Sequence, residues 1–547
     1  MTAVDIDGAA PESRAGWARR SRPRLAAVSA AIVGAFSGLL ALLYAASVHA
    51  GASDSDKATT ILVGQAMGDG HLLLHGWILA PGSYWTSDAL FYALAVRLVG
   101  LRPGLLYAEP AVVAALTIAV GILLTFEGHG VPAGFVGAVA VVALLAFATP
   151  AMDFWFVGKG FHVATALYAL VAFGALRRGR FGWGWALAVV LLAFGMLGDL
   201  MIVAFAVAPL FVAGLVTMLR ERRWQSGIAQ VTAAVASGGI GEIALRFADT
   251  LGKFKLGATL RIADLGQMLT NVGHLFTYGA HLVGWTNGPR AIGGVPVGLL
   301  AVHAVGAACM LACLFVALVS LVAGVIRGRS PNAPPSSGTE LWRLDDMLLF
   351  ATLGSSVMFV ILAGANGVGV HFLVVPIVFA SVLTGRMVAR AWSKVPAGWT
   401  ARALATAGLA VSLSFAAGLG YALSRPAPTQ PASSLAAWLE AHDLTSGLGG
   451  YWSAAITTVE SNGAVMVRPV TIEADRVERM MSQSSASWYA GQRFQFFVYA
   501  MSTRRSSNRY FRAATMTWGT PAHVYRPGRY HVLVWDHTLS VASFPHT

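Results

Sequence analysis

The sequence predicts a polytopic α-helical membrane protein that carries a small water-soluble domain after its last membrane span. Two observations concern composition: 56% of the 547 residues are hydrophobic and only 12% are charged, whereas about 25% of residues are charged in an ordinary soluble domain. The third observation is that the apolar residues gather in long uncharged runs up to residue 424. A chain with so few charges cannot cover its own surface in water, so most of it is expected to face lipid.

The first uncharged run extends from residue 25 to residue 53 and predicts a membrane-spanning helix. At a rise of about 1.5 Å per residue, it exceeds the roughly 20 residues that a helix needs to cross the hydrocarbon core. It is also too long to be the core of a signal peptide. The basic segment 1–24 in front of it is therefore predicted to be a cytoplasmic tail.

Ten later runs predict the remaining spans, for a total of about eleven in the transmembrane domain 25–424. One segment stays ambiguous: 86–101 is apolar but carries Asp88 and Arg97, so an additional crossing there is an alternative. The ten runs are 110–126, 131–152, 161–176, 181–198, 200–219, 227–241, 295–326, 347–370, 372–385 and 403–424.

The net charge of +13 does not indicate a nucleic-acid-binding patch, because the positive residues are spread over the connections between runs. That distribution is typical of cytoplasmic loops. With an odd number of spans, it predicts a multi-pass protein of the cytoplasmic membrane with its N-terminus inside and its C-terminal domain outside. The basic positions are Arg14, Arg19, Arg20, Arg22, Arg24, Arg177, Arg178, Arg180, Arg220, Arg222, Arg223, Arg327, Arg329, Arg386, Arg390, Lys394 and Arg402.

Three connections then lie on the exterior side: the first loop 50–85, the short connection 151–161 and the long connection 246–290. The long connection mixes charged and apolar residues, which suits helices that lie in the plane of the interface. Cys309 and Cys313 are four residues apart in an apolar run and are interpreted as small buried hydrophobic residues.

The chain after the last span changes character. A proline-rich linker, 425–431, separates the bilayer from a soluble domain, 432–547. Within this domain a short helix is predicted at 435–444. Segments rich in β-branched and aromatic residues predict a small α+β or mostly β fold. These segments are 454–461, 464–472, 493–500 and 531–540.

Polar residues that would carry chemistry concentrate in the first exterior loop. Asp54 and Asp56 follow the first span directly, where the head group of a lipid-linked substrate would lie. Partial desolvation raises the basicity of a carboxylate, so either residue would serve as a general base. The plainer interpretation is that both residues only cap the loop at the lipid boundary. A divalent metal at this pair is a further interpretation, without enough ligands in the sequence to support it.

The second group lies in the short connection on the same side. Lys159 and His162 would bind a phosphate, as a point charge and as a hydrogen-bond donor, whereas the plainer interpretation has Lys159 reaching out to the interface. Asp199 interrupts a long apolar stretch, which favours a functional role, although an ordinary exterior turn explains it equally well. His371 lies at the turn of a later hairpin and faces the same side.

The order of these features resembles the GT-C membrane glycosyltransferases, in particular the bacterial group related to protein mannosyltransferases and aminoarabinose transferases. The resemblance covers most of the chain through short, degenerate motifs. They are SDSDKATT at 53–60, GDGHLLLHGW at 68–77, TSD at 86–88 followed by an aromatic segment, HFLVVP at 371–376, and GYWSAAITTVESNG at 450–463 in the exterior domain.

The resemblance implies a GT-C-like fold and a polyprenyl-phosphate-linked sugar as donor. It assigns the catalytic carboxylate to Asp54 or Asp56, without choosing between them. It also implies that the carrier is bound by a set of later residues, namely Asp88, Lys159, His162, His371, His71 and Trp77. Many relatives have an arginine in the motif that reads HFLVVP here, so the phosphate-binding assignment departs from the family pattern.

The leading hypothesis is therefore an inverting glycosyltransferase that moves a sugar from polyprenyl phosphate to an unidentified glycan, lipid or protein outside the cytoplasm. A transporter or flippase of a lipid or glycan is the alternative, although the internal repeat typical of transporters is not found in the sequence. A third interpretation is a membrane-anchored binding module in which the C-terminal domain does the work.

Overall fold

The computed structural model describes most of the chain, including every predicted site residue. The described ranges are 12–51, 53–222, 224–257, 261–286, 296–327, 338–363, 367–501 and 504–541. Among the features predicted from the sequence, Arg223, Arg329 and residues 1–11 of the basic tail lie outside these ranges.

Most of the described residues up to Leu423 form a bundle of long apolar helices, which confirms the multi-pass membrane class. Within the described residues, eight helices are long and apolar enough to cross a membrane, and a bent pair makes a ninth if it is one span. Two shorter apolar helices, α7 and α8, accompany them. The bundle consists of α1 (Glu12–Ala50), α4 (Leu105–Phe126), α5 (Val131–Leu145), α6 (Pro150–Asp153), α7 (Val163–Leu176), α8 (Trp183–Gly198), α9 (Ala208–Glu221), α10 (Ile228–Thr250), α12 (Val297–Arg327), α13 (Gly338–Ile361), α14 (Val374–Trp392) and α15 (Trp399–Leu423).

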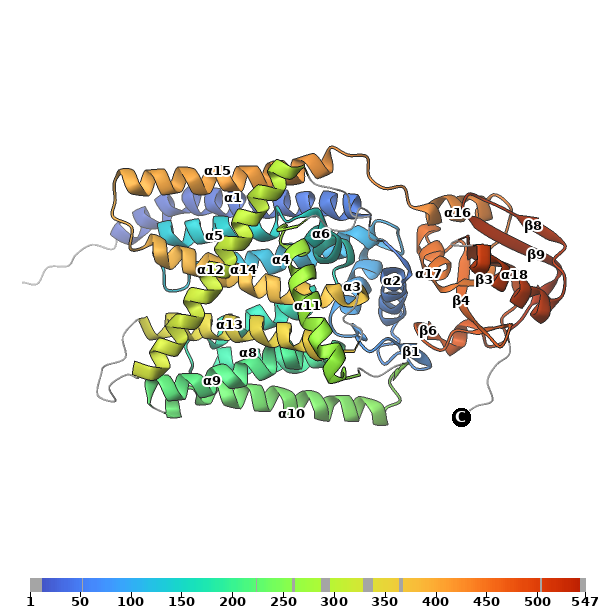
Figure 1. Cartoon of the computed structure of the whole chain (residues 1–547), viewed down its shortest axis with the longest axis horizontal. Coiled ribbons are helices and arrows are strands. Elements are labelled where there is room, and N and C mark those ends of the chain that lie inside the picture. Colours follow the sequence, from blue (N-terminus) through green and yellow to red (C-terminus); the bar gives the residue numbers. More distant parts are fainter. Residues whose placement is uncertain are drawn as a thin grey trace, which may run out of the picture.

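Figure 1 shows the helices of the bundle running broadly along the long axis of the molecule, with the C-terminal domain at one end. We call this end of the bundle the domain end. Two shorter helices lie there, α2 (Ser55–Gly68) and α3 (Asp88–Val99). The connections α9–α10 and α14–α15, which carry predicted cytoplasmic basic residues, lie at the opposite end (Figure 1).

The ambiguous segment 86–101 forms α3, which has 12 residues. At about 1.5 Å per residue it is too short to cross a bilayer, and it packs against α2 instead. The predicted interface segment 246–290 begins with the end of α10, which extends to Thr250, and continues into α11 (Leu265–Leu282). Asn271 ties α11 to α13 by donating to the carbonyl oxygens of Val360 and Leu362, at 2.9 and 3.0 Å.

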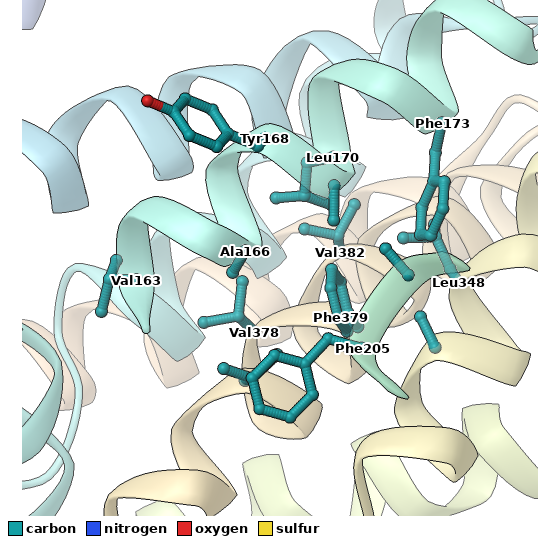
Figure 2. Close-up of a cluster of buried hydrophobic side chains, with 14 of the residues drawn as sticks. Val163, Ala166, Tyr168, Leu170, Phe173, Phe205, Leu348, Val378, Phe379 and Val382 are labelled. Atoms are coloured by element: carbon teal, nitrogen blue, oxygen red, sulfur yellow. The ribbon is translucent and has the colours of Figure 1, made fainter. Parts of the chain in front are cut away.

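The interior of the bundle is packed by helices that are apolar on all sides, as expected for buried helices. Nearly every residue of α7 is buried. Figure 2 shows Leu170 and Phe173 of α7 beside Phe379 and Val382 of α14 in this core. Helices α5 and α14 approach closely at two glycines: a Cβ atom on Gly137 would lie 2.5 Å from the carbonyl oxygen of Gly385, so only a residue without a side chain fits there.

Arg386 and Arg390 were predicted to lie in a cytoplasmic loop, and this was wrong, because both belong to α14. Arg386 is buried, and its Nε lies 2.5 Å from Oδ1 of Asp345 on α13. Arg390 pairs with the other oxygen of the same carboxylate. Within apolar surroundings a guanidinium needs such a partner, because an unpaired buried charge is costly.

The C-terminal domain is an α+β fold built on a six-stranded sheet of order β5-β4-β3-β7-β9-β8. Strand β3 is parallel to both of its neighbours, β4 and β7, and the remaining pairs are antiparallel. Its elements are α16 (Pro431–Glu440), β3 (Ser446–Gly450), α17 (Tyr451–Glu460), β4 (Met466–Glu473), β5 (Arg476–Arg479), β7 (Phe494–Ala500), α18 (Arg504–Trp518), β8 (His523–Tyr525) and β9 (Tyr530–Leu539).

Three of the four predicted strands are confirmed, as β4, β7 and β9, but the strand predicted at 454–461 is wrong. These residues belong to the helix α17, whose residues Ser453 to Val459 are all buried. A short apolar run does not distinguish a buried strand from a buried helix. Here α17 packs against α2 on one side and β4 on the other, and this tertiary packing outweighs the β preference of Ile456 and its neighbours.

A second, small sheet joins the domain to the bundle. Strand β1 (Trp77–Leu79) of the first loop lies between β2 (Lys255–Leu256), which follows α10, and β6 (Ser484–Ser485) of the C-terminal domain. The pairing of β1 with β6 is antiparallel, with Trp77 opposite Ser485. Three segments that are far apart in the sequence are therefore held together at the domain end.

Candidate active site

A cavity of about 340 Å³ opens at the domain end of the bundle. Its size suits a small polar ligand or head group, because ligand pockets begin at about 300 Å³. Its charged and imidazole side chains are Asp56, Asp199, His162 and His371, and among the described residues no lysine or arginine lines it. Other walls come from the start of α2, the segment 79–84 and Gln483 of the C-terminal domain.

The two aspartates of the first loop occupy different positions. Asp54 is the N-cap of α2, and its Oδ1 accepts hydrogen bonds from the backbone N–H groups of Asp56 and Lys57, at 3.1 and 3.4 Å. Such a side chain satisfies N–H groups that a helix start leaves free. Its other carboxylate oxygen pairs with the ammonium group of Lys159. Asp54 therefore holds the start of the helix.

Asp56 comes two residues later and lines the cavity. Its Oδ1 accepts a hydrogen bond from the hydroxyl of Tyr451, the first residue of α17. Burial raises the pKa of Asp56, and the hydrogen bond from Tyr451 offsets part of that rise. A carboxylate in this state is a stronger base than one in water, and it faces open space in which a hydroxyl group would fit.

Across the cavity, His162 and Asp199 form a buried pair. The Nδ1 atom of His162 lies 2.6 Å from Oδ2 of Asp199, which also accepts a hydrogen bond from the hydroxyl of Thr165 at 2.6 Å. The backbone N–H of Met201 donates to Oδ1 at 3.0 Å. Burial acts to raise the pKa of Asp199, but His162 and these two donors together bring it below its usual value.

The pairing of Nδ1 leaves Nε2 of His162 on the other side of the ring, 3.5 Å from the hydroxyl of Tyr84. The backbone is unusual here, because His162 has a φ of 63°. It comes three residues after the end of a π-helical turn, Phe154–Lys159. Such strained positions and π-bulges are frequent at functional sites. The ring of His371 stacks on that of His162, with 5.4 Å between ring centroids and an interplanar angle of 10°.

The other predicted carrier-binding residues do not line the cavity among the described residues. Lys159 is engaged by Asp54. Asp88 is buried at the start of α3, and His71 is exposed. Trp77 is buried and makes an edge contact with Trp488 of the C-terminal domain, with ring centroids 4.9 Å apart. Contact of these four residues with a carrier stays a prediction.

Sequence reasoning assigned no site role to three residues. Tyr84 and Gln483 line the wall, and Tyr451 reaches Asp56 from a domain that was predicted separately. Asp199 was considered a functional residue because of its charge in an apolar stretch, and it does line the cavity. Tyr451 gave no such signal, because its partner is 395 residues away.

A metal site is not formed by the described residues: no group of three or more His, Cys, Asp or Glu side chains lies close enough together to hold an ion. Of the two aspartates considered as metal ligands, Asp54 is paired with the ammonium group of Lys159.

Asp88 is expected to make stability dependent on pH. Burial raises the pKa of this carboxyl from 3.8 to about 6. As the pH rises from about 4 to about 6, the unfolded chain loses the proton while the folded chain keeps it, so the folded state loses stability. The variant Asp88→Asn has no such ionisation. We expect the melting temperature of Asp88→Asn minus that of the wild type to be larger at about pH 7.5 than at about pH 4.5. An equal difference at both pH values would contradict this.

Comparisons with known proteins add a similarity of overall structure. A scan of protein-family models and a search of curated proteins both gave no match. Two crystal structures of ArnT from Cupriavidus metallidurans, one bound to undecaprenyl phosphate and one in the apo state, are similar at 13% sequence identity and a TM-score of 0.40. Each comparison covers 92% of this chain and 98% of the other.

Proposed function

We propose that the protein is a membrane glycosyltransferase that moves a sugar from a polyprenyl phosphate carrier to an acceptor hydroxyl on the outer side of the cytoplasmic membrane. The observation that carries this proposal is the position of Asp56, a buried carboxylate whose pKa is raised and which lines a cavity opposite the His162–Asp199 pair. The motif order of the chain supports the same class. The domain end of the bundle is the exterior side in this proposal.

The reaction is a direct displacement that inverts the anomeric carbon. Asp56 takes the proton of the acceptor hydroxyl, and the acceptor oxygen forms a bond to the anomeric carbon. The bond between that carbon and the phosphate oxygen breaks, and polyprenyl phosphate leaves with both bonding electrons. A base placed in this way contributes about 10²–10⁴-fold to the rate.

The two histidines are proposed to receive the departing phosphate. Among the described residues they are the cavity's only side chains able to carry a positive charge. Asp199 fixes the ring of His162 through Nδ1, and Nε2 is proposed to meet the phosphate in place of its 3.5 Å contact with the Tyr84 hydroxyl. Asp54 and Lys159 are proposed to position the start of α2, and through it Asp56.

The test is a transfer assay with purified protein in lipid nanodiscs and a panel of synthetic polyprenyl-phosphate sugars. We expect release of polyprenyl phosphate that depends on an added cell-envelope extract, with the sugar recovered in the inverted configuration. Absence of release across the panel, together with movement of a labelled lipid donor across vesicles that contain the protein, would replace the transferase by a transporter.

A further inference from the structure

One hydroxyl group of the C-terminal domain contacts Asp56, the proposed base. Tyr451 is the first residue of α17, directly after β3, a strand with neighbours on both sides in the six-stranded sheet. Its phenol donates a hydrogen bond to Oδ1 of Asp56. The central strand and the packed helix hold the backbone of Tyr451, and its hydrogen bond to Asp56 holds the hydroxyl.

The surrounding packing holds that contact in place. The buried side chains of Ala455, Ile456 and Val459 on α17 share one apolar cluster with Ala58 and Ile61 on α2. Helix α17 therefore lies on the helix that carries Asp56.

The small sheet fixes the same interface from a second side. Its strand β6 pairs with β1, and the backbone N–H of Ala486 donates to the carbonyl oxygen of Gly76 at 2.8 Å. The neighbouring residue Gln483 lines the cavity. Two separate segments of the C-terminal domain, one with Tyr451 and one with Gln483, therefore reach the candidate site.

We infer that Tyr451 is a positioning residue: its hydroxyl orients the Asp56 carboxylate toward the acceptor, and the C-terminal domain is a constituent of the active site. This inference rests on the proposed function for its catalytic consequence, but the contact itself does not. The acceptor hydroxyl approaches the carboxylate oxygen that Tyr451 leaves free.

A hydrogen bond to the charged form stabilises it, so loss of the Tyr451 hydroxyl is expected to raise the pKa of Asp56 further. The other titratable groups that line the cavity with Asp56 belong to separate elements and stay unchanged in a variant at position 451. They are Tyr84 in the segment before α3, His162 before α7, Asp199 after α8, and His371 before α14.

The first experiment compares Tyr451→Phe with the wild type in the transfer assay. We expect kcat to fall about tenfold, because a misoriented base loses part of its contribution, while KM for the donor stays within about twofold. The acidic limb of the kcat profile is expected to move to higher pH.

Tyr489→Phe is the matched control. Its hydroxyl is also in the C-terminal domain and donates to the carbonyl oxygen of Pro469 at 2.5 Å, but Tyr489 does not line the cavity. This variant loses a comparable hydrogen bond and should keep the wild-type pH profile. A fall in kcat for Tyr451→Phe that Tyr489→Phe reproduces, with no movement of the pH profile in either variant, would overturn the inference.

The second experiment does not depend on turnover. Infrared difference spectra recorded against pH report protonation of the Asp56 carboxyl, identified as the band that Asp56→Asn lacks. We expect a higher midpoint in Tyr451→Phe than in the wild type and in Tyr489→Phe. A shifted midpoint in a protein that transfers no sugar would support the contact and refute the proposed function. Transfer with an unshifted midpoint and unchanged kcat would refute the role of Tyr451 and leave the function standing.

Discussion

Replacing Asp56 with asparagine is expected to lower kcat for sugar transfer by about 10²–10⁴-fold, the usual contribution of a positioned general base. Asparagine has nearly the same shape and still accepts the hydrogen bond from Tyr451 through its amide oxygen. It cannot take the acceptor proton. The measurement is single-turnover transfer at saturating donor, together with the melting temperature to show that the variant is folded.

The matched control is Asp54→Asn, two residues away. Asparagine is as good an N-cap as aspartate, so α2 should still begin at the same place, although the ion pair with Lys159 is lost. We expect this variant to melt at a lower temperature and to keep measurable turnover with the wild-type pH profile. Full turnover in Asp56→Asn, or equal inactivity in two well-folded variants, would contradict the division of roles between the aspartates.

Replacing Asp199 with asparagine is expected to affect both stability and transfer. The carboxylate is fully buried and meets His162, Thr165 and the N–H of Met201. Loss of the carboxylate charge weakens all three of these hydrogen bonds, so we expect the free energy of unfolding to fall by about 3 kcal/mol. The ring of His162 would also lose the partner that fixes its orientation, and misplacement of a group in an active site by about 1 Å can cost about 10²-fold in rate.

Thr165→Val separates these effects, because it removes one hydrogen bond to Asp199 and keeps the contact with His162. We expect a loss of about 1 kcal/mol in the free energy of unfolding and little change in kcat. The measurements are thermal unfolding in detergent and the transfer assay. If Asp199→Asn were no less stable and no slower than Thr165→Val, the pair would have no special role.

Most of the bundle could be predicted from the sequence, because a membrane span needs only length and apolar composition, and both are local properties. The last span, predicted at 403–424, matches α15 closely. Helix boundaries inside the protein were harder, since buried charges such as Arg386 look like loop residues until their partners are known. Helix α17 was mistaken for a strand for a related reason, because its burial comes from α2 and not from its own pattern.

The sequence placed Asp54, Asp56, His162 and His371 in the same region but could not assign their positions. Whether a carboxylate at i or at i+2 faces a cavity depends on where the helix begins, and that is visible only from the hydrogen bonds of Asp54. Lys159 looked available for phosphate, yet the fold brings Asp54 against it. Such long-range pairings leave no local trace in the sequence.

The sheet formed by β2, β1 and β6 has a consequence for biogenesis. Strand β1 is made early, but its partner β6 is made only after every described bundle helix has left the ribosome. Until then, one edge of β1 has no strand beside it. The carboxylate of Asp56 also lacks the hydrogen bond from Tyr451 until the C-terminal domain is made. A nascent chain that stalls after the last span would hold its helices in the bilayer without an assembled site. Assembly of the candidate site therefore requires Tyr451 and β6, which follow the last bundle helix in the sequence.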